Sequence, residues 1–374
     1  MINKYKKFVL GFVVLLLLTI GFHYFAWIKY TSHVLLVHDD IYTGDLGRMS
    51  LYANSSFPRQ AYPSAKSVNL PREHINFVTW YKTKQNVDMI TIGDSFSNAA
   101  TQGTNPFYQD YIATYNNFSV LNLNQLSGLN YIETITALTN NGLIEQINPK
   151  YILIESVERF SIGRFANNID FNITRPLDLT INEFNRLSNP YLGKDENIKF
   201  INNQNFKAVK NNILYNFDDR AFNTKCYKKE LKKDFFTSKD KNSLLFFKED
   251  IDVLYKATMK NIEKLNDNFN KLAEILEKKG ITLIFMPAAD KYNLYSKYIK
   301  DNNLPNSVFF ENLRKLPKKY IFIDTKNILS KALEDGVKDL YYPDDTHWSY
   351  KASDIIFRDF NFKKEIRVDD EKNK

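Results

Sequence analysis

An apolar run from Phe8 to Ile28 places the strongest limit on what this chain can fold into. As a helix the run is about 31 Å long, which is enough to cross the hydrocarbon core of a bilayer. Three lysines precede it, and no small-x-small cleavage site follows it. Because positive residues stay on the cytoplasmic side, we expect an uncleaved single-pass anchor in the inner (cytoplasmic) membrane. Everything after Lys29 is then expected in the periplasm or at the cell exterior.

Four regions are expected from the changes in pattern along the chain. They are a cytoplasmic tail and anchor (1–30), a tether that packs on the domain (31–85), a catalytic domain (86–365) and a charged tail (366–374). Within the catalytic domain the periodicity loosens over about 160–256, and we interpret this stretch as a mainly helical insertion.

Composition excludes few function classes. Hydrophobic residues make up 44% of the chain and aromatic residues 15%, so a folded core is expected rather than disorder. The formal charge of +8 has two interpretations, a general lysine bias or attraction to an anionic surface or polymer. A nucleic-acid partner is not expected. The single cysteine, Cys226, excludes an intrachain disulfide and a cysteine metal cluster.

Strand-like and helix-like segments alternate beyond residue 86. The expected strands are 89–92, 118–123, 150–157, 281–286 and 320–323, and the expected helices are 131–143, 257–279 and 353–360. The strand at 150–157 is nearly continuous and β-branched, as a strand covered on both faces should be. The alternation predicts an α/β fold, a doubly wound parallel five-stranded sheet with helices on both faces.

The first strand breaks into a Gly93-Asp94-Ser95 turn. Such a turn leaves a serine hydroxyl at the carboxyl edge of a sheet, which is the usual mounting for a nucleophile. Gly, Asp and Ser are also common turn residues, so the turn alone is weak evidence.

A second segment, Tyr342 to Ser349, supplies what a serine nucleophile needs. Serine requires an adjacent base, and His347 is the candidate because the other four histidines lie in the anchor or the tether. A carboxylate must orient the imidazole, and the spacing allows Asp344 or Asp345. We favour Asp344 slightly.

These motifs resemble the SGNH, or GDSL, hydrolase superfamily. Within it they are similar to the alginate O-acetyltransferase branch (AlgX/AlgJ-like). The similar stretches are Gly93–Ser97, Glu155–Arg159, Pro287 with Lys291, and Asp345–Trp348. In that branch the Asp-Thr-His-Trp motif precedes the serine, whereas here it follows.

The resemblance implies further site residues. The backbone N–H groups of Ser95 and Gly128 would hold the oxyanion, with Asn130 as a substitute for the asparagine that the superfamily places after its third strand. Arg159 is expected at the rim of the site, and Trp348 either packs under the histidine loop or contacts a sugar. No cofactor and no metal site are expected.

Two function classes follow. The first is an enzyme that acetylates an exported cell-surface glycan, either a polysaccharide or peptidoglycan, through an acetyl-serine, or that removes such acetyl groups as an esterase. The second is a non-catalytic glycan-binding or assembly subunit of an export complex. A transferase outside the cytoplasm needs its acetyl group delivered, so a multi-spanning membrane acyltransferase is the expected partner.

Overall fold

The computed structural model describes residues 2–35, 41–61, 67–187, 199–358, 360 and 362. The predicted charged tail, 366–374, lies outside these residues. The limits predicted for the tether and the catalytic domain stay predictions.

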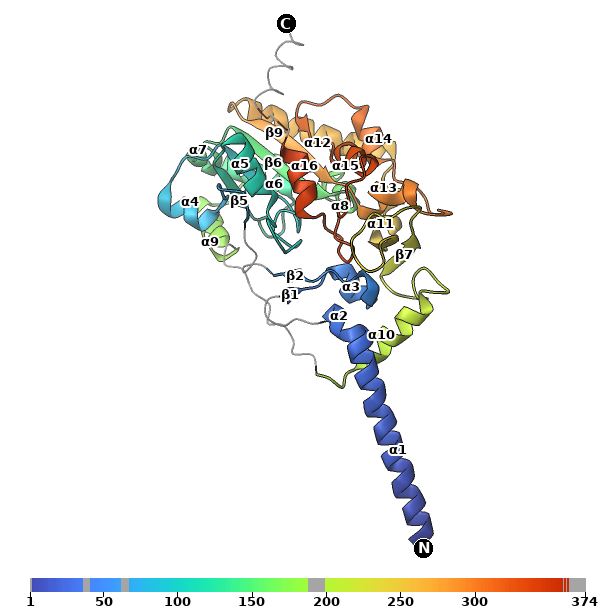
Figure 1. Ribbon diagram of the computed structural model, residues 1–374. Helices are drawn as coiled ribbons and strands as arrows, with labels where there is room; N and C mark the ends of the chain where they lie inside the picture. The colour runs from blue at the N-terminus through green and yellow to red at the C-terminus, as the bar shows by residue number, and fades with distance from the viewer. Residues whose placement is uncertain are drawn as a thin grey trace.

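A six-stranded parallel sheet forms the centre of the molecule (Figure 1). Its spatial order is β10-β9-β6-β4-β5-β3. The strands are β3 (Ile75–Asn76), β4 (Met89–Ile92), β5 (Val120–Leu123), β6 (Tyr151–Val157), β9 (Thr282–Ala288) and β10 (Ile321–Phe322). The predicted doubly wound parallel sheet is therefore confirmed. The sheet has one strand more than predicted, because the short strand β3 pairs with the outer edge of β5.

Both faces of the sheet are covered, as the apolar sequence of β6 predicts. All seven residues of β6 are buried. Ile152 and Ile154 pack in one hydrophobic cluster, whereas Tyr151 and Leu153 pack in the other. This alternation puts successive side chains on opposite faces, so a polar substitution on either face would enter a core.

Helices contribute the other half of each cluster. One face is covered by α4 (Phe77–Thr83), α6 (Tyr131–Asn140), α7 (Leu143–Ile147), α8 (Glu158–Phe165), α9 (Leu177–Leu187), α12 (Met259–Glu277) and α14 (Phe309–Arg314). The other face is covered by α5 (Tyr108–Asn116), α13 (Lys291–Tyr295), α15 (Thr325–Glu334) and α16 (Tyr350–Arg358). Short 3-10 turns complete the connections, η2 (Ala53–Ser55), η3 (Leu254–Lys256) and η4 (Ser296–Tyr298).

The long helix α12 illustrates how sequence sets these helices. The Thr258 side chain accepts a hydrogen bond from the backbone N–H of Asn261 and caps its first turn. Ile262, Leu265 and Phe269 keep helical spacing and are fully buried against the sheet. Replacing Leu265 with alanine should cost about 2–5 kcal/mol of stability, because it leaves a cavity in a packed core.

The insertion is mainly helical, as predicted, and includes the end of α8 and all of α9. It contains α10 (Asn203–Leu214) and α11 (Glu249–Asp252), but also an antiparallel pair, β7 (Cys226–Glu230) and β8 (Ser243–Phe247). β7 lies in the lysine-rich stretch 225–233. It pairs with β8, where Leu244 and Phe246 are fully buried. The apolar strand partner, which is distant in sequence, therefore decides the conformation of this charged segment.

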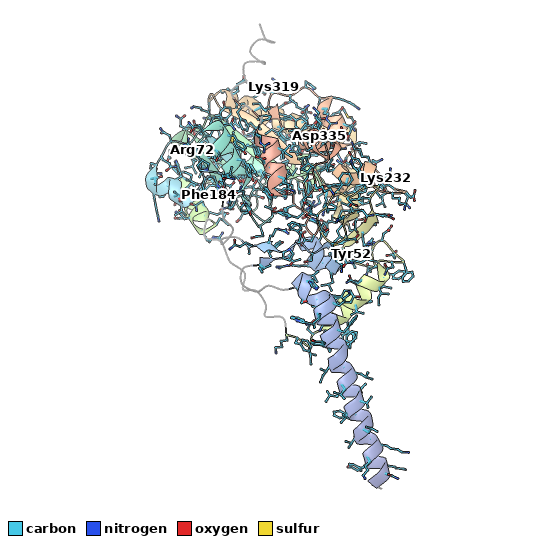
Figure 2. All side chains as sticks on the ribbon, in the orientation of Figure 1. Tyr52, Arg72, Phe184, Lys232, Lys319 and Asp335 are labelled. Carbon is cyan, nitrogen blue, oxygen red and sulfur yellow. The ribbon has the colours of Figure 1, made fainter. Side chains whose placement is uncertain are left out.

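The N-terminal helix stands apart from the domain. It comprises α1 (Ile2–Ala26), a π-helical stretch η1 (Trp27–Thr31) and α2 (Ser32–Leu35), and it projects as a rod (Figure 1). Residues 3–35 form one helix that is long and apolar enough to cross a membrane, and 6% of its most apolar window is buried. The side chains of α1 point into open space along most of the rod (Figure 2). A core helix would instead be covered.

Between the rod and the sheet lie three short elements of the tether. They are β1 (Ile41–Tyr42), α3 (Asp45–Ser50) and β2 (Arg59–Gln60), and β1 pairs with β2 in antiparallel register. Figure 1 shows them at the base of the domain, where α1 meets it.

Candidate active site

Ser95 lies directly beyond the carboxyl end of β4, at the edge of the sheet. Its Oγ is 2.7 Å from Nε2 of His347, although 252 positions separate the two residues. Gly93 makes this turn possible, since a Cβ at that position would collide with the side chains of Ser97 and Glu155. The structure thus brings together the serine and the histidine that the sequence singled out.

Asp345 contacts the other nitrogen of the same imidazole. Its Oδ1 is 2.6 Å from Nδ1 of His347 and also accepts the backbone N–H of His347 at 3.0 Å. An N–H at Nδ1 leaves Nε2 as an acceptor facing the hydroxyl of Ser95. Burial acts to lower the pKa of His347, but the Asp345 carboxylate raises it above its ordinary value.

Asp344, the residue slightly favoured from the sequence as the histidine partner, contacts the tether instead of His347. Its Oδ2 accepts the backbone N–H groups of Gly44 at 2.9 Å and Phe57 at 3.0 Å, and its Oδ1 pairs with Arg59 at 3.0 Å. The expectation for Asp344 is therefore corrected. The Asp344 carboxylate contacts the tether, whereas the Asp345 carboxylate contacts both the imidazole and Arg59 of the tether.

Arg59 of the tether holds both carboxylates at once. Its guanidinium pairs with Asp344 and Asp345, and its side chain is 5% exposed. Burial disfavours the charged guanidinium, but the two carboxylates raise its pKa. In turn, the pKa of Asp345 is held below its usual value by His347 and Arg59, against the effect of burial.

Two further tether residues contact this loop. Asp45 accepts the backbone N–H of Thr346 at 2.8 Å and its hydroxyl at 2.6 Å. Gly44 lies so close to the backbone of Asp344 that a Cβ would overlap its carbonyl. Sequence analysis missed Arg59, Asp45 and Gly44, because about 300 positions separate them from their partners.

Lys291 supports the same loop from the opposite side. Its ammonium donates to the carbonyls of Tyr342 at 2.7 Å, Pro343 at 3.0 Å and Asp345 at 3.0 Å. Burial lowers the pKa of Lys291 to about 8, despite the nearby carboxylates. The sequence motif had included Lys291 without a role, and the structure places it as a three-way brace.

The serine turn has a separate set of supports, which come from β6 and α8. Asp94 accepts the backbone N–H of Val157 at 2.9 Å and pairs with Arg164. Burial acts to raise the pKa of Asp94. Arg164 and the hydrogen bonds to Asp94 outweigh this effect, so the pKa lies below its ordinary value. Glu155 accepts the N–H of Asp94 at 3.0 Å and the hydroxyl of Ser97 at 2.8 Å.

The expected oxyanion donors fall into two groups. Among the described residues, the backbone N–H groups of Ser95 and Gly128 have no protein partner, so both are open to an acceptor. Asn130 caps α6 instead: its side chain accepts the N–H of Glu133 at 3.0 Å, and Glu133 returns the bond. No hydrogen bond within the described ranges joins Gly128 or Asn130 to Ser95 or His347.

Trp348 and Arg159 are both buried. Trp348 is 2% exposed and packs edge-on against Phe96 at 4.7 Å, so it supports the loop from within the core and is not open to a sugar. Arg159 pairs with Asp290 at 2.7 Å and Asp250 at 3.3 Å. Its Nε is buried without a partner among the described residues.

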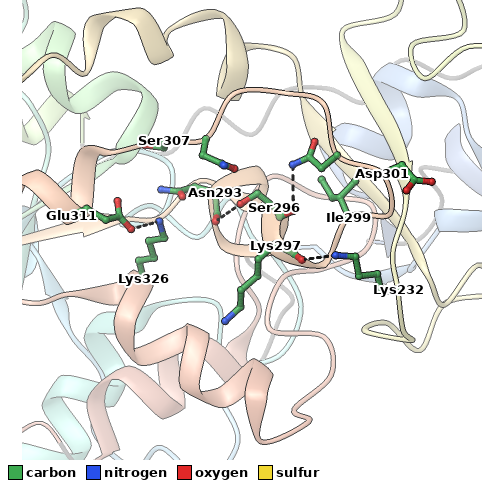
Figure 3. Close-up of a pocket in the computed structure, with 11 residues that line it drawn as sticks. Lys232, Asn293, Ser296, Lys297, Ile299, Asp301, Ser307, Glu311 and Lys326 are labelled. Carbon is green, nitrogen blue, oxygen red and sulfur yellow. Dashed lines mark hydrogen bonds and ion pairs between the residues drawn. The ribbon is translucent and has the colours of Figure 1, made fainter.

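Two pockets of similar size lie on the surface. The Arg159 pocket, about 610 Å³, is lined by residues that include Arg159, Phe160, Arg164 and Tyr255. The Lys326 pocket, about 580 Å³, is lined by residues that include Lys232, Asn293, Glu311 and Lys326 (Figure 3). Arg164 joins the first pocket to Asp94, the neighbour of Ser95. In the described part of the chain, no hydrogen bond or ion pair joins the residues of the second pocket directly to Ser95 or His347.

Asp45, Asp345 and His347 bring three possible metal-ligand atoms within 4.8 Å of one another. Each of these side chains already has a protein partner, Thr346 for Asp45 and one another for Asp345 and His347. The site is therefore organised as a hydrogen-bond relay that ends at the hydroxyl of Ser95.

Comparison with known proteins agrees with this geometry. Residues 241–357 match the family model described as the SGNH hydrolase-like domain of the acetyltransferase AlgX. The match includes Lys291 and the Asp344–Trp348 segment, and it does not extend to Ser95. No curated protein matches the chain. Together with the parallel sheet, this match shows that residues 241–357 are similar to the SGNH hydrolase-like domain of AlgX and supports an SGNH-like fold.

Proposed function

We propose that this protein is a membrane-anchored O-acetyltransferase that acetylates an exported cell-surface glycan. The observation that carries the proposal is the continuous relay from Ser95 Oγ to His347 Nε2 and from His347 Nδ1 to Asp345. Such a relay makes a serine hydroxyl nucleophilic, because the imidazole accepts its proton and the carboxylate stabilises the resulting cation.

The proposed reaction has two halves. Ser95 Oγ attacks the acetyl carbonyl of the donor, His347 takes the hydroxyl proton and passes it to the departing donor oxygen, and acetyl-Ser95 remains. A sugar hydroxyl then attacks the acetyl-serine while His347 takes its proton, so the sugar ester forms and Ser95 regains its hydrogen. The free N–H groups of Ser95 and Gly128 are the proposed donors to the oxyanion in both halves.

We assign the glycan acceptor to the Arg159 pocket. Tyr255 is 74% exposed there and Phe160 lies beside two arginines, a combination of aromatic faces and hydrogen-bond donors that suits a sugar ring. The pocket also touches Arg164, which holds Asp94 next to the nucleophile. The Lys326 pocket has no such connection and serves as a control for mutagenesis.

The acetyl donor is the remaining element of the proposal. An enzyme on the outer side of the inner membrane finds no acetyl-CoA, so we propose that a multi-spanning membrane acyltransferase delivers the acetyl group. The N-terminal rod then has a chemical purpose. It keeps Ser95 close to the delivery point and raises the effective concentration of donor and acceptor.

Glycan acetylation in cells separates the candidate functions. Cells that carry Ser95→Ala should lose the O-acetyl groups of the target glycan, with the protein still present in the membrane fraction. Unchanged acetylation would favour a non-catalytic glycan-binding subunit. A gain of acetyl groups would instead identify an acetylesterase, because both reactions pass through the same acetyl-serine.

The anchor needs its own test. The full-length protein should remain in the membrane fraction and be accessible to protease from the outer side only. Recovery of a mature soluble form that begins after Lys29 would overturn the single-pass anchor.

A further inference from the structure

The insertion contains an apolar surface that the acyl-transfer site does not use. It lies on and around α10, where six large hydrophobic side chains are exposed. They are Phe200, Ile201, Phe206, Ile213, Phe217 and Phe222, with exposed fractions between 37% and 78%. A soluble surface rarely gathers so many apolar side chains in one short segment.

Three of these side chains share one face of the helix. Phe206 and Ile213 lie seven positions apart and Phe217 follows after four more, a spacing that keeps them on one side of α10 and the turn after it. The opposite side holds the buried residues Ala208 and Asn211. The exposed stripe therefore lies on the side of α10 opposite these buried residues, and Phe206 at one end of it also contacts α1.

Contacts with the N-terminal helix show where along that helix the stripe lies. Phe206 stacks on Phe22 with ring centroids 4.5 Å apart, and Asn205 Nδ2 is 2.8 Å from Nδ1 of His23. Figure 1 shows α10 beside the end of α1 that meets the domain. Phe22 lies six residues before the end of the apolar run, roughly 9 Å along the helix. The stripe is thus level with the last turns of the proposed membrane span.

The charge of the segment matches a lipid headgroup layer. Lys199, Lys207 and Lys210 are exposed, and no acidic residue occurs between Lys199 and Phe217. None of these lysines has an ion pair in the described part of the chain. Amphipathic helices that lie in a bilayer interface combine an apolar face with lysines in this way.

We propose that α10 lies in the membrane–water interface on the outer side of the membrane that holds the anchor. There it binds anionic phospholipid through the stripe of Phe206, Ile213 and Phe217. This inference rests on the proposed anchor, because the apolar rod supplies the lipid surface that the stripe continues. A protein partner in the membrane is the competing occupant. We favour lipid because the stripe is flanked by lysines and is continuous, through the contact of Phe206 with Phe22, with the exposed apolar side chains of α1.

The same helix is tied to the active-site loop. Asn211 Nδ2 donates to the carbonyl of Ser50 at 2.9 Å, and Asn212 Nδ2 donates to the carbonyl of Leu51 at 2.6 Å, both at the end of α3. At its other end α3 carries Asp45, which holds Thr346. Binding of α10 to the bilayer would therefore set the height of the catalytic loop above the membrane.

The test uses the full-length chain in vesicles of phosphatidylcholine and phosphatidylglycerol. A Phe217→Cys variant is labelled with an environment-sensitive fluorophore and quenched by lipids that carry a nitroxide near the headgroup. Native Cys226 is fully buried, so the unsubstituted chain measures background labelling. Val308→Cys is the matched control, because Val308 is 45% exposed and directly precedes α14, which Figure 1 shows far from the rod.

Nitroxide lipid should quench about half or more of the fluorescence at position 217, since interfacial side chains sit ~5–10 Å into the headgroup boundary. Fluorescence at position 308 should not change, and Lys207→Glu with Lys210→Glu should reduce the quenching at 217. Equal, weak quenching at both positions would overturn the proposal. The proposal would also be overturned, in favour of a protein partner, if the cysteine at position 217 were protected from labelling in native membranes but not in lipid vesicles.

The readout does not involve Ser95, so it is independent of the proposed acetyl transfer. A chain that fails to float with the vesicles overturns both the anchor and the interfacial helix. A chain that floats while position 217 stays unquenched overturns the interfacial helix alone.

Discussion

The two halves of the candidate site are held in place in different ways. The serine turn, Gly93–Ser97, is supported by the neighbouring strand β6 and by Arg164 in the last turn of α8. The histidine loop, Tyr342–Ser349, is supported by the tether at Gly44, Asp45 and Arg59 and by Lys291 below it. A turn at the end of a central strand is held by the adjacent strand and helix. The histidine loop does not follow directly on a strand of the sheet, so contacts from the tether and from Lys291 hold it in place.

This difference gives the tether a second purpose. A segment that merely linked the anchor to the domain would make few buried contacts. Here Arg59 is buried between two carboxylates, and Gly44 lies against the backbone of Asp344. The chain that follows the N-terminal apolar helix therefore holds the histidine loop in place, and the following predictions separate the contributions of the two halves.

The largest effect is expected where the halves meet. Ser95→Ala and His347→Ala should each remove about 10⁴-fold or more of the turnover of a small activated acetyl ester, because each breaks the relay. The double variant should be little worse than either single variant. Losses that multiply, measured by steady-state kinetics on folded protein, would show that the two residues do not share a mechanism.

The two adjacent carboxylates should differ next. Asp345→Asn should lower kcat by up to about 10⁴-fold, since an amide no longer holds His347 with its Nε2 free to accept a proton. Asp344→Asn should mainly reduce stability, because it weakens the bonds to Gly44, Phe57 and Arg59. Measuring kcat and the midpoint of thermal unfolding for both variants checks the assignment, and equal losses of kcat would contradict it.

Removing the guanidinium should break the frame of the histidine loop. Arg59→Met leaves two buried carboxylates unpaired and should cost about 3–5 kcal/mol of stability, together with activity. Arg72→Met is the matched control, because Arg72 is an exposed arginine farther along the tether (Figure 2). Chemical denaturation with both variants gives the comparison, and similar midpoints would mean that the tether does not hold the loop.

The brace below the loop should matter less. Lys291→Met leaves three carbonyls without their donor, and losing one such buried partner typically costs about 1–3 kcal/mol. Lys319→Met should have no measurable effect, since Lys319 makes only an exposed pair with Glu274 on the periphery (Figure 2). If urea denaturation ranks the two variants in the opposite order, the brace is not a support.

The smallest effect concerns pH. His347 must be neutral to accept the proton of Ser95, and Asp345 raises the pKa of His347 above 6.5. The acid limb of kcat/KM should therefore lie above pH 6.5, and removing the carboxylate charge with Asp345→Asn should move it to lower pH, as pH–rate profiles of both proteins would show.

Stability should follow the same linkage with its own sign. A raised pKa in the folded state means that the His347–Asp345 pair stabilises the fold fully below pH 6.5 and loses this contribution as pH rises through the folded value. Thermal unfolding of the wild type and Asp345→Asn across this range should converge at higher pH. A constant difference between them would contradict the linkage.

The sequence by itself determined the features that depend on residues close together in the chain: the N-terminal apolar helix, the alternation of strands and helices, and the candidate residues Ser95 and His347. A single 21-residue apolar run can satisfy all its backbone hydrogen bonds in lipid only as a helix. β-Branched strands that alternate with amphipathic helices bury their apolar faces as a parallel sheet with helices on both sides. Ser95 and His347 could be named because a strand-edge turn and the sole histidine outside the anchor and tether limited the choices. These inferences depend on contacts between neighbours in the chain.

Only the tertiary structure decided between Asp344 and Asp345, because adjacent side chains leave a loop in directions that its backbone dihedrals set. The roles of Arg59 and Asp45 were likewise invisible in the sequence. They arise where the tether returns to a loop 285 to 301 positions away. Pairing over such distances depends on how the whole sheet places its edges. Burial then makes each pairing necessary, since a charge removed from water must find its counter-charge wherever the fold brings one.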